Sequence, residues 1–330
     1  MKATAIANSN IALVKYWGKR NEELILPYNS SISMTLDKLY TTTTVEFSKK
    51  YSKDELTIDG EKISGEELER VERQLNLIRR TAKVSEKAKI ASASNFPKAA
   101  GLASSASAFA ALTLAATKAL DLHLPKKELS IIARQGSGSA CRSIYGGFVE
   151  WQKGTLENGE DSYAMQVAPQ NHWPELCMIV NVLTPKQKKI KSRAGMAQTI
   201  ATSPLYKAWL ETVESDLEKV RSGILEKKFP LLGQTAEMNA LKMHSTMITT
   251  EPHIIYWEPE TIVMMKEVMQ LREEATECYF TIDGGPQVKV LCLEKDAKKI
   301  EKRFSEMKEV QKTFLCKTGG DAKLIDMELF

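Results

Sequence analysis

Asp283 is the acidic residue best placed to do chemistry in this sequence. It follows an apolar run that ends at Ile282 and precedes Gly284, Gly285 and Pro286. A carboxylate on a tight loop held by a strand is a frequent position for a catalytic group. The alternative is an ordinary Asp-Gly turn, which is the commoner use of that pair.

Two segments rich in glycine and serine offer sites for anions. Residues 97–107 place three serines where an uncharged, apolar stretch begins. The free N–H groups of a helix start favour phosphate there, although close packing of a small-residue helix fits the pattern equally well. Residues 135–147 hold four glycines and three serines around Arg142, which suits bidentate binding of a carboxylate. A flexible loop with a surface arginine is the alternative, and the apolar flanks weaken it.

Basic residues gather in two further places. Residues 10–20 contain Lys15 and Lys19 beside Tyr16 and Trp17, so that Lys19 can pair with a distant carboxylate and tune it. The alternative there is a strand end with a solvated basic flank. Residues 186–193 hold four lysines and one arginine, which is usually a solvated face; a clamp for a diphosphate is the alternative. The four histidines fall in no metal-like pattern, and we expect them to be structural: His123, His172, His244 and His253.

Composition excludes several classes of protein. The excess of 46 Lys+Arg over 42 Asp+Glu is too small to indicate a nucleic-acid-binding protein. The five cysteines show no metal-ligand spacing and fit reduced thiols. The N-terminal residues lack a signal-peptide pattern, so we expect a cytoplasmic protein. Residues 99–120 carry only Lys118 as a charge, but their Ala, Gly and Ser content favours a buried helix over a membrane span.

The elements that must position these residues are strands and helices in mixed order. We predict a strand over residues 3–8, a loop at Ser9 and Asn10, and strands over 41–47, 87–95, 146–152, 176–182, 278–282, 288–293 and 313–316. Helical spacing predicts helices over residues 64–83, 126–134, 258–275 and 296–307, as well as in the apolar stretch. Ser64 with Glu67 predicts a capping box, and Ser203 predicts the cap of a long helix. A length of 330 residues favours two domains, with a change of character that divides the chain into 1–185 and 186–330.

Six segments together resemble the diphosphomevalonate decarboxylase family of the GHMP kinase superfamily. They are residues 10–19, 26–31, 96–107, 136–151, 192–196 and 280–286, and the resemblance runs from Asn10 to about Leu293. Tyr-Trp-Gly-Lys at 16–19 and Gly-Ser-Gly-Ser-Ala-Cys-Arg-Ser at 136–143 point to the decarboxylase branch. The resemblance implies a two-domain α+β fold of GHMP kinase type. Its N-terminal nucleotide-binding domain would be a ribosomal-protein-S5-like α/β domain, and its C-terminal domain a ferredoxin-like α+β domain, with a cleft between them.

The implied reaction is ATP-dependent decarboxylation of mevalonate 5-diphosphate. With ATP and Mg²⁺ the 3-hydroxyl is phosphorylated, and phosphate and CO₂ then leave to give isopentenyl diphosphate. By motif match Asp283 is the base, Lys19 accompanies it, and Arg142 with Asn10 holds the substrate carboxylate. Further substrate contacts are expected from Tyr16, Trp17, Arg70, Ser139, Lys188 or Lys189, Ser192 and Arg193. Nucleotide contacts are expected from Ser94, Asn95, Pro97, Gly101, Ser104, Ser105 and Ser107. The resemblance also implies a homodimer, and we expect no protein metal ligand, nucleic acid or membrane partner.

Three other functions stay open. A decarboxylase of the 5-monophosphate differs by one phosphate, a kinase of this superfamily would phosphorylate without decarboxylation, and an anion-binding regulator would not react at all. Kinase-only relatives are expected to lack the Asp, Lys, Arg set that this chain keeps. The chain reads Asp-Gly-Gly-Pro-Gln where the family more often shows Asp-Ala-Gly-Pro-Asn. Gly284 is a small departure, whereas Gln287 puts a neighbouring contact in doubt.

Overall fold

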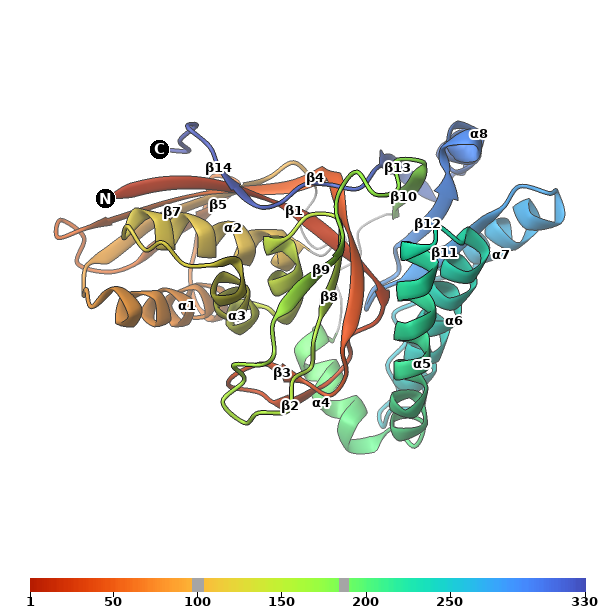
Figure 1. Ribbon diagram of the computed structural model, residues 1–330, viewed down its shortest axis with the longest axis horizontal. Coiled ribbons are helices and arrows are strands. Elements are labelled where there is room, and N and C mark those ends of the chain that lie inside the picture. The colour runs from red at the N-terminus through yellow and green to blue at the C-terminus, as the bar shows by residue number, and fades with distance from the viewer. Residues whose placement is uncertain (97–103, 184–189) are drawn as a thin grey trace.

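Two β-sheets, each covered by helices, lie side by side in the computed structural model of the chain (Figure 1). The structure describes residues 1–96, 104–183 and 190–330. The first layer holds most of the N-terminal half of the chain, and the second holds most of the C-terminal half. This is the two-domain α+β architecture that the sequence predicts.

The first sheet has eight strands in the order β14-β1-β4-β7-β5-β6, with β8 paired to β4 and β9 paired to β8. All its pairs are antiparallel except β5 with β7. Its strands are β1 (Lys2–Val14), β4 (Ser31–Ser48), β5 (Glu55–Ile58), β6 (Glu61–Ile63), β7 (Lys87–Ser94), β8 (Phe148–Trp151), β9 (Ala164–Ala168) and β14 (Lys323–Leu324). The associated helices are α1 (Glu66–Ala82), α2 (Ser104–Ala119), α3 (Lys126–Gly136) and the 3₁₀ helix η1 (Gly138–Ile144), and a separate hairpin joins β2 (Lys19–Asn21) to β3 (Leu26–Pro27).

The second sheet has four antiparallel strands in the order β11-β12-β10-β13. They are β10 (Leu176–Leu183), β11 (Cys278–Ile282), β12 (Val288–Leu293) and β13 (Val310–Cys316). The helices of this layer are α4 (Ser192–Thr202), α5 (Tyr206–Leu225), α6 (Phe229–Ile248), α7 (Pro259–Glu273) and α8 (Glu294–Ser305). Strand β10 precedes residue 185 but belongs to the second sheet, so the sheets do not divide at that residue. The division of the chain into domains 1–185 and 186–330 stays a prediction.

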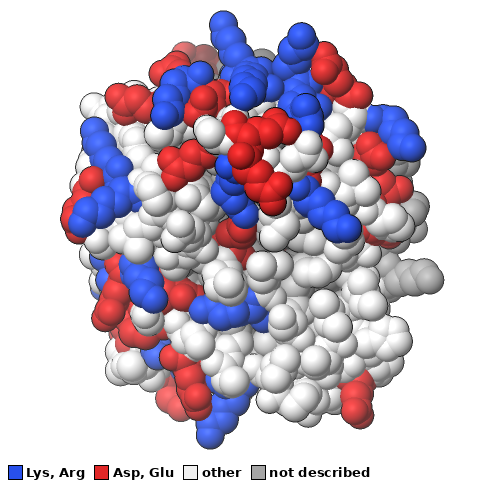
Figure 2. Space-filling model, turned by 90° about the vertical axis from the view of Figure 1, so that its right-hand side faces the viewer, with Lys and Arg blue, Asp and Glu red and all other residues white. Residues whose placement is uncertain are grey.

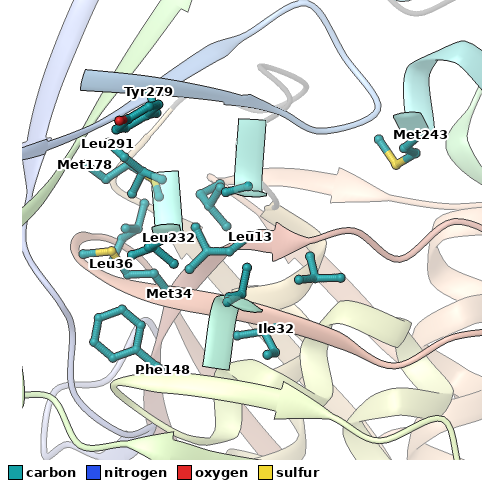
Figure 3. Packing of buried hydrophobic residues seen from close by; sticks show 14 of the residues in the cluster. Leu13, Ile32, Met34, Leu36, Phe148, Met178, Leu232, Met243, Tyr279 and Leu291 are labelled. Atoms are coloured by element: carbon teal, nitrogen blue, oxygen red, sulfur yellow. The ribbon is translucent and has the colours of Figure 1, made fainter. Parts of the chain in front are cut away.

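One apolar core joins the two layers. Leu13, Ile32 and Met34 from the first sheet and Met178 and Leu291 from the second belong to a single buried cluster, which α6 completes (Figure 3). Separate cores lie between the first sheet and α1–α3 and between the second sheet and α7–α8. Because burial of apolar surface is the dominant stabilising term, the shared core fixes the end of β1 against the β11–β12 hairpin.

Three local predictions are wrong. Ser9 and Asn10 continue β1 instead of forming a loop, because their side chains hydrogen-bond to other segments of the fold. Helix α1 has Gly65 as its N-cap, with no side-chain cap, so the capping box of Ser64 is absent. Ser203 is the C-cap of α4, a helix that the sequence analysis did not predict, and α5 begins at Tyr206.

The uncharged stretch forms α2, whose buried side chains belong to the core beneath the first sheet. Within the described ranges, no helix is long and apolar enough to cross a membrane. On the face of the molecule seen in Figure 2, cationic and anionic side chains are intermixed instead of segregated, which agrees with the small net charge.

Candidate active site

Asp283 lies between two buried lysines where the layers meet. Lys15 Nζ is 2.7 Å from Asp283 Oδ1, and Lys289 Nζ is 3.2 Å from Oδ2. Lys15 follows the end of β1, whereas Lys289 lies on β12 of the other sheet. Both lysine side chains are 1% exposed, but that of Asp283 is 26% exposed. Asp283 is therefore the member of this trio, which we call the reacting centre, whose side chain is partly open to a ligand, although its Oδ2 is buried.

The charges of the reacting centre depend on one another. Burial raises the pKa of the Asp283 carboxyl, but the ammonium groups of Lys15 and Lys289 outweigh it and hold this pKa far below its usual range. Burial lowers the pKa of Lys15 to about 8 even though Asp283 opposes the change. At neutral pH the site consequently holds an ionised carboxylate and a protonated Lys15.

Hydrogen bonds that involve side chains hold the Asp283 loop to three elements, α6, α7 and β10. His244 on α6 places Nε2 3.1 Å from the Asp283 carbonyl oxygen, and Thr261 on α7 donates to the carbonyl of Pro286 at 2.8 Å. Gln287 accepts a hydrogen bond from the Leu183 N–H at the end of β10 at 2.6 Å. Burial, aided by Lys15, lowers the pKa of His244 to about 3. We therefore assign a neutral imidazole that donates from Nε2.

Arg142 is held by neutral groups. Its Nε lies 3.2 Å from Asn10 Oδ1 and 3.0 Å from Ser33 Oγ, and its Nη1 lies 2.6 Å from Ser31 Oγ. Among the described residues no carboxylate forms an ion pair with it. Burial lowers the pKa of Arg142, and the nearby charge of Asp283 opposes that change. The structure thus places Arg142 beside Asn10 and within electrostatic range of Asp283. That the two hold the substrate carboxylate stays a prediction.

Two arginines share one backbone carbonyl, and Lys19 lies within electrostatic range of both. Arg70 on α1 and Arg193 on α4 each donate from Nη2 to the Gly136 oxygen at 3.3 Å. Lys19 is electrostatically coupled to both arginines, and its ammonium bonds to Glu22. Burial and Arg193 lower the pKa of Arg70 to about 10. We call Lys19, Arg70 and Arg193 the cation group.

The predicted contact between Lys19 and Asp283 is absent, and Lys15 makes the contact instead. The backbone explains the exchange. Gly18 has φ 113°, and a Cβ there would lie 2.0 Å from the Tyr206 hydroxyl oxygen. The chain turns at this glycine into the β2–β3 hairpin, so Lys19 lies with the cation group.

Hydroxyl groups line the start of α2. Ser107 lies 2.8 Å from Thr41 Oγ1 and 3.2 Å from Ser9 Oγ, and Ser105 lies 3.1 Å from Ser137 Oγ. The first turn of the helix contains no acidic residue. Ser104 is its first residue, so three of the predicted nucleotide contacts gather here. Pro97 and Gly101 lie outside the described residues, as does Lys188.

Other predicted residues have partners of their own. The Asn95 side chain joins Tyr40 to Lys38, and Ser94 bonds to Thr41. These bonds belong to the β4–β7 region of the sheet. Trp17 donates its indole N–H to Thr199 at 3.1 Å and packs in the shared core.

The remaining predicted substrate residues each have contacts of a different kind. The Ser139 carbonyl accepts a hydrogen bond from Asn10 at 3.0 Å. Ser192 begins α4 near Gly284. The Tyr16 hydroxyl is buried without a hydrogen-bond partner in the described part of the chain.

Two family models match consecutive parts of the chain. Residues 7–164 match the diphosphomevalonate decarboxylase-like N-terminal domain, and residues 178–324 match the mevalonate 5-diphosphate decarboxylase C-terminal domain. The chain belongs to the diphosphomevalonate decarboxylase family. Diphosphomevalonate decarboxylase of Candida albicans is 40% identical over 298 residues, which cover 86% of this chain and 82% of that protein.

Solved structures of this family share the fold. The mevalonate diphosphate decarboxylase from Enterococcus faecalis is 43% identical, with a TM-score of 0.92 and 99% of both chains covered. MDDEF in complex with MVAPP, AMPPCP and magnesium is also 43% identical over 99% of both chains, with a TM-score of 0.93. The predicted two-domain GHMP-kinase-like fold is therefore confirmed.

Three residues of the site were not predicted from the sequence to be functional: Lys15, Lys289 and His244. Lys15 was noted only as part of a basic segment. Lys289 carried a usable signal, since a lysine inside the apolar strand Val288–Leu293 needs a buried partner. His244 carried none, because its contact is to a backbone atom 39 residues away.

Proposed function

We propose that this chain catalyses the ATP-dependent decarboxylation of mevalonate 5-diphosphate to isopentenyl diphosphate. The observation that carries the proposal is the partly accessible Asp283 carboxylate between two buried lysines, with Arg142 nearby. Membership of the diphosphomevalonate decarboxylase family supports the same reaction.

At the reacting centre, Asp283 would accept a hydrogen bond from the tertiary 3-hydroxyl. Because its pKa is so low, it is a weak proton acceptor, and we propose that it orients the hydroxyl first and takes the proton as the O–P bond forms. Phosphoryl transfer depends mainly on such positioning and on charge neutralisation. Lys15 and Lys289 keep the carboxylate ionised and in place.

Arg142 and Asn10 would hold the substrate carboxylate. Only neutral oxygen atoms accept from the Arg142 guanidinium in the described structure, so its charge is available to an anion. After the phosphoryl group is transferred, the C3–O bond breaks and releases phosphate. The C1–C2 bond electrons then form the C2–C3 double bond as CO₂ leaves.

The cation group would bind the diphosphate end. Arg70 and Arg193 share one carbonyl acceptor and have no carboxylate within ion-pair distance among the residues described. Like charges held this close favour an anion that touches all of them. Tyr16, whose buried hydroxyl has no hydrogen-bond partner in the described ranges, would donate to the same anion. Ser139 and Ser192 remain proposed contacts of the substrate, and so does Lys188, which lies outside the described residues.

The start of α2 fits the triphosphate of ATP. Ser104, Ser105 and Ser107 stand at the positive end of a 16-residue helix without a nearby acid in its first turn. Mg²⁺ would screen the phosphate charges, and such ions are usually held through substrate phosphates with few protein ligands. The described residues contain no group of three or more His, Cys, Asp or Glu side chains able to hold a metal, so the phosphates would supply most of its ligands.

The deciding assay compares the 5-diphosphate and 5-monophosphate substrates at equal concentration, with ATP and Mg²⁺. We expect CO₂ and ADP in equal amounts from the diphosphate and little turnover of the monophosphate. Preference for the monophosphate would identify the alternative decarboxylase. ADP without CO₂ would identify a kinase, and binding without turnover would identify a regulator.

The homodimer and the cytoplasmic location implied by the sequence remain proposals. Light scattering on the purified chain would test the first, since a dimer of a 36.9 kDa chain has twice that mass. Fractionation of the source cells would test the second.

A further inference from the structure

We propose that the Glu22 carboxylate takes the place of the substrate's diphosphate when the site is empty. It forms an ion pair with the Lys19 ammonium until the diphosphate binds and displaces it. The inference rests on the proposed role of the cation group. It concerns a residue that the proposed reaction does not use.

The first observation is the imbalance of charge. Glu22 makes the only ion pair to a member of the cation group among the described residues. Arg70 and Arg193 must instead share the neutral carbonyl of Gly136. Glu22 is also within electrostatic range of Tyr16, whose buried hydroxyl has no hydrogen-bond partner among the residues that the structure describes. Glu66 and Glu67 also act on Arg70, but without an ion pair to it in the described structure. Glu22 is thus the carboxylate that pairs directly with a group that an incoming anion would meet.

The second observation is the difference in accessibility between the two partners. The side chain of Lys19 is 3% exposed, whereas that of Glu22 is 61% exposed. A buried ammonium needs a counter-ion, but an exposed carboxylate can rotate into water at little cost. Glu22 is therefore the partner that can move when the ion pair breaks. The Lys19 ammonium then stays in place for another anion.

These two observations give Glu22 a definite effect on binding. When the site is empty, Glu22 reduces the repulsion among three like charges. When a diphosphate binds, the carboxylate must move away or remain as a like charge beside the ligand. Either way, Glu22 weakens diphosphate binding and should have no effect on the chemical step at Asp283.

Calorimetric titration of the full chain with inorganic pyrophosphate tests this effect. Glu22→Gln keeps the shape of the side chain and removes its charge. We expect pyrophosphate to bind roughly two- to fivefold more tightly to this variant, which corresponds to the strength of an exposed ion pair. The difference should shrink at high salt. With the diphosphate substrate, KM should fall by a similar factor at unchanged kcat.

Glu23→Gln is the matched control, because Glu23 is the adjacent exposed acid and has no ion pair in the described structure. It should leave pyrophosphate affinity unchanged. Equal affinities for the two variants, or weaker binding to Glu22→Gln, would overturn the inference.

The variant Arg193→Gln distinguishes a failure of this inference from a failure of the proposed function. If that variant binds pyrophosphate as the unmodified chain does, the anion is not at the cation group, and both the diphosphate assignment and the inference fail.

Discussion

The reacting centre and the cation group differ in how their positive charges are neutralised. At the reacting centre, Lys15 and Lys289 are buried and both face the one carboxylate of Asp283. In the cation group, both arginines donate to the carbonyl of Gly136, and the one carboxylate that forms an ion pair with the group in the described structure is the exposed Glu22. The first arrangement fixes a reacting group before substrate arrives. The second leaves charge to be satisfied by the substrate itself.

Removal of Asp283 should have the largest effect. We expect Asp283→Asn to lower kcat by about 10²–10⁴-fold, because the variant keeps the shape but can no longer take the proton. KM for the diphosphate substrate should change little, since the cation group is intact. Steady-state kinetics check both quantities. A turnover close to that of the unmodified chain would remove Asp283 from the mechanism.

Asp283→Ala should add a loss of stability that Asp283→Asn partly avoids. It leaves two buried ammonium groups without a counter-ion, and a broken buried pair costs about 3–5 kcal/mol. Denaturant unfolding of both variants measures the difference. Equal stabilities would show that the lysines are not held by this carboxylate.

High pH should break the reacting centre without unfolding the protein. Lys15 has a pKa of about 8 in the folded chain against an ordinary value of 10.5. As pH rises through 8, Lys15 loses its proton and Asp283 loses a partner, so kcat should fall. Between pH 8 and pH 10.5 the unfolded chain binds more protons at Lys15 than the folded chain does. The contribution of Lys15 to the free energy of unfolding therefore increases with pH over this range.

A pH profile of kcat, measured beside unfolding at each pH, checks this sign. In Lys15→Arg the guanidinium keeps its proton, so the decline in kcat near pH 8 should disappear if the variant folds. A decline that persists in a folded Lys15→Arg variant would assign the titration to another group.

Removal of one arginine of the cation group should affect binding and not chemistry. We expect Arg193→Gln to raise KM for the diphosphate substrate by about 10–10²-fold, the loss of one charge-assisted hydrogen bond, at nearly constant kcat. Arg80→Gln is the control, because Arg80 is an exposed arginine in the last turn of α1 with no ion pair in the described ranges. A fall in kcat with constant KM would mean that the two regions do not divide binding from reaction.

The sequence predicted these two regions unequally. The two layers follow from alternating and helical apolar patterns, and the long-range pairing of Asn10 with Arg142 follows from the family motifs. Which lysine meets Asp283 does not follow from them. Lys15 and Lys19 are four residues apart in one segment, and the turn at Gly18 sends them to different regions. Contacts such as His244 with the Asp283 backbone depend on tertiary packing that no local pattern reports.

A methyl group added at Gly284 should have the smallest effect on stability and kcat. It tests how rigidly the reacting centre is held. A Cβ at this position would lie 2.9 Å from Trp17 Cζ3 and 3.6 Å from Ser192 Oγ. The backbone of Gly284 lies outside the left-handed region, so space is the only obstacle. The indole would have to shift by a few tenths of an ångström, and its N–H is bound to Thr199.

We expect Gly284→Ala to cost about 1 kcal/mol of stability, at the low end for overpacking, and to lower kcat by less than the Asp283 variants. Unfolding and kinetics on Gly284→Ala, Trp17→Phe and the double variant form a cycle that isolates the contact. The smaller ring should relieve the crowding, so the losses should be less than additive. Additive losses would show that Trp17 does not set the position of the loop.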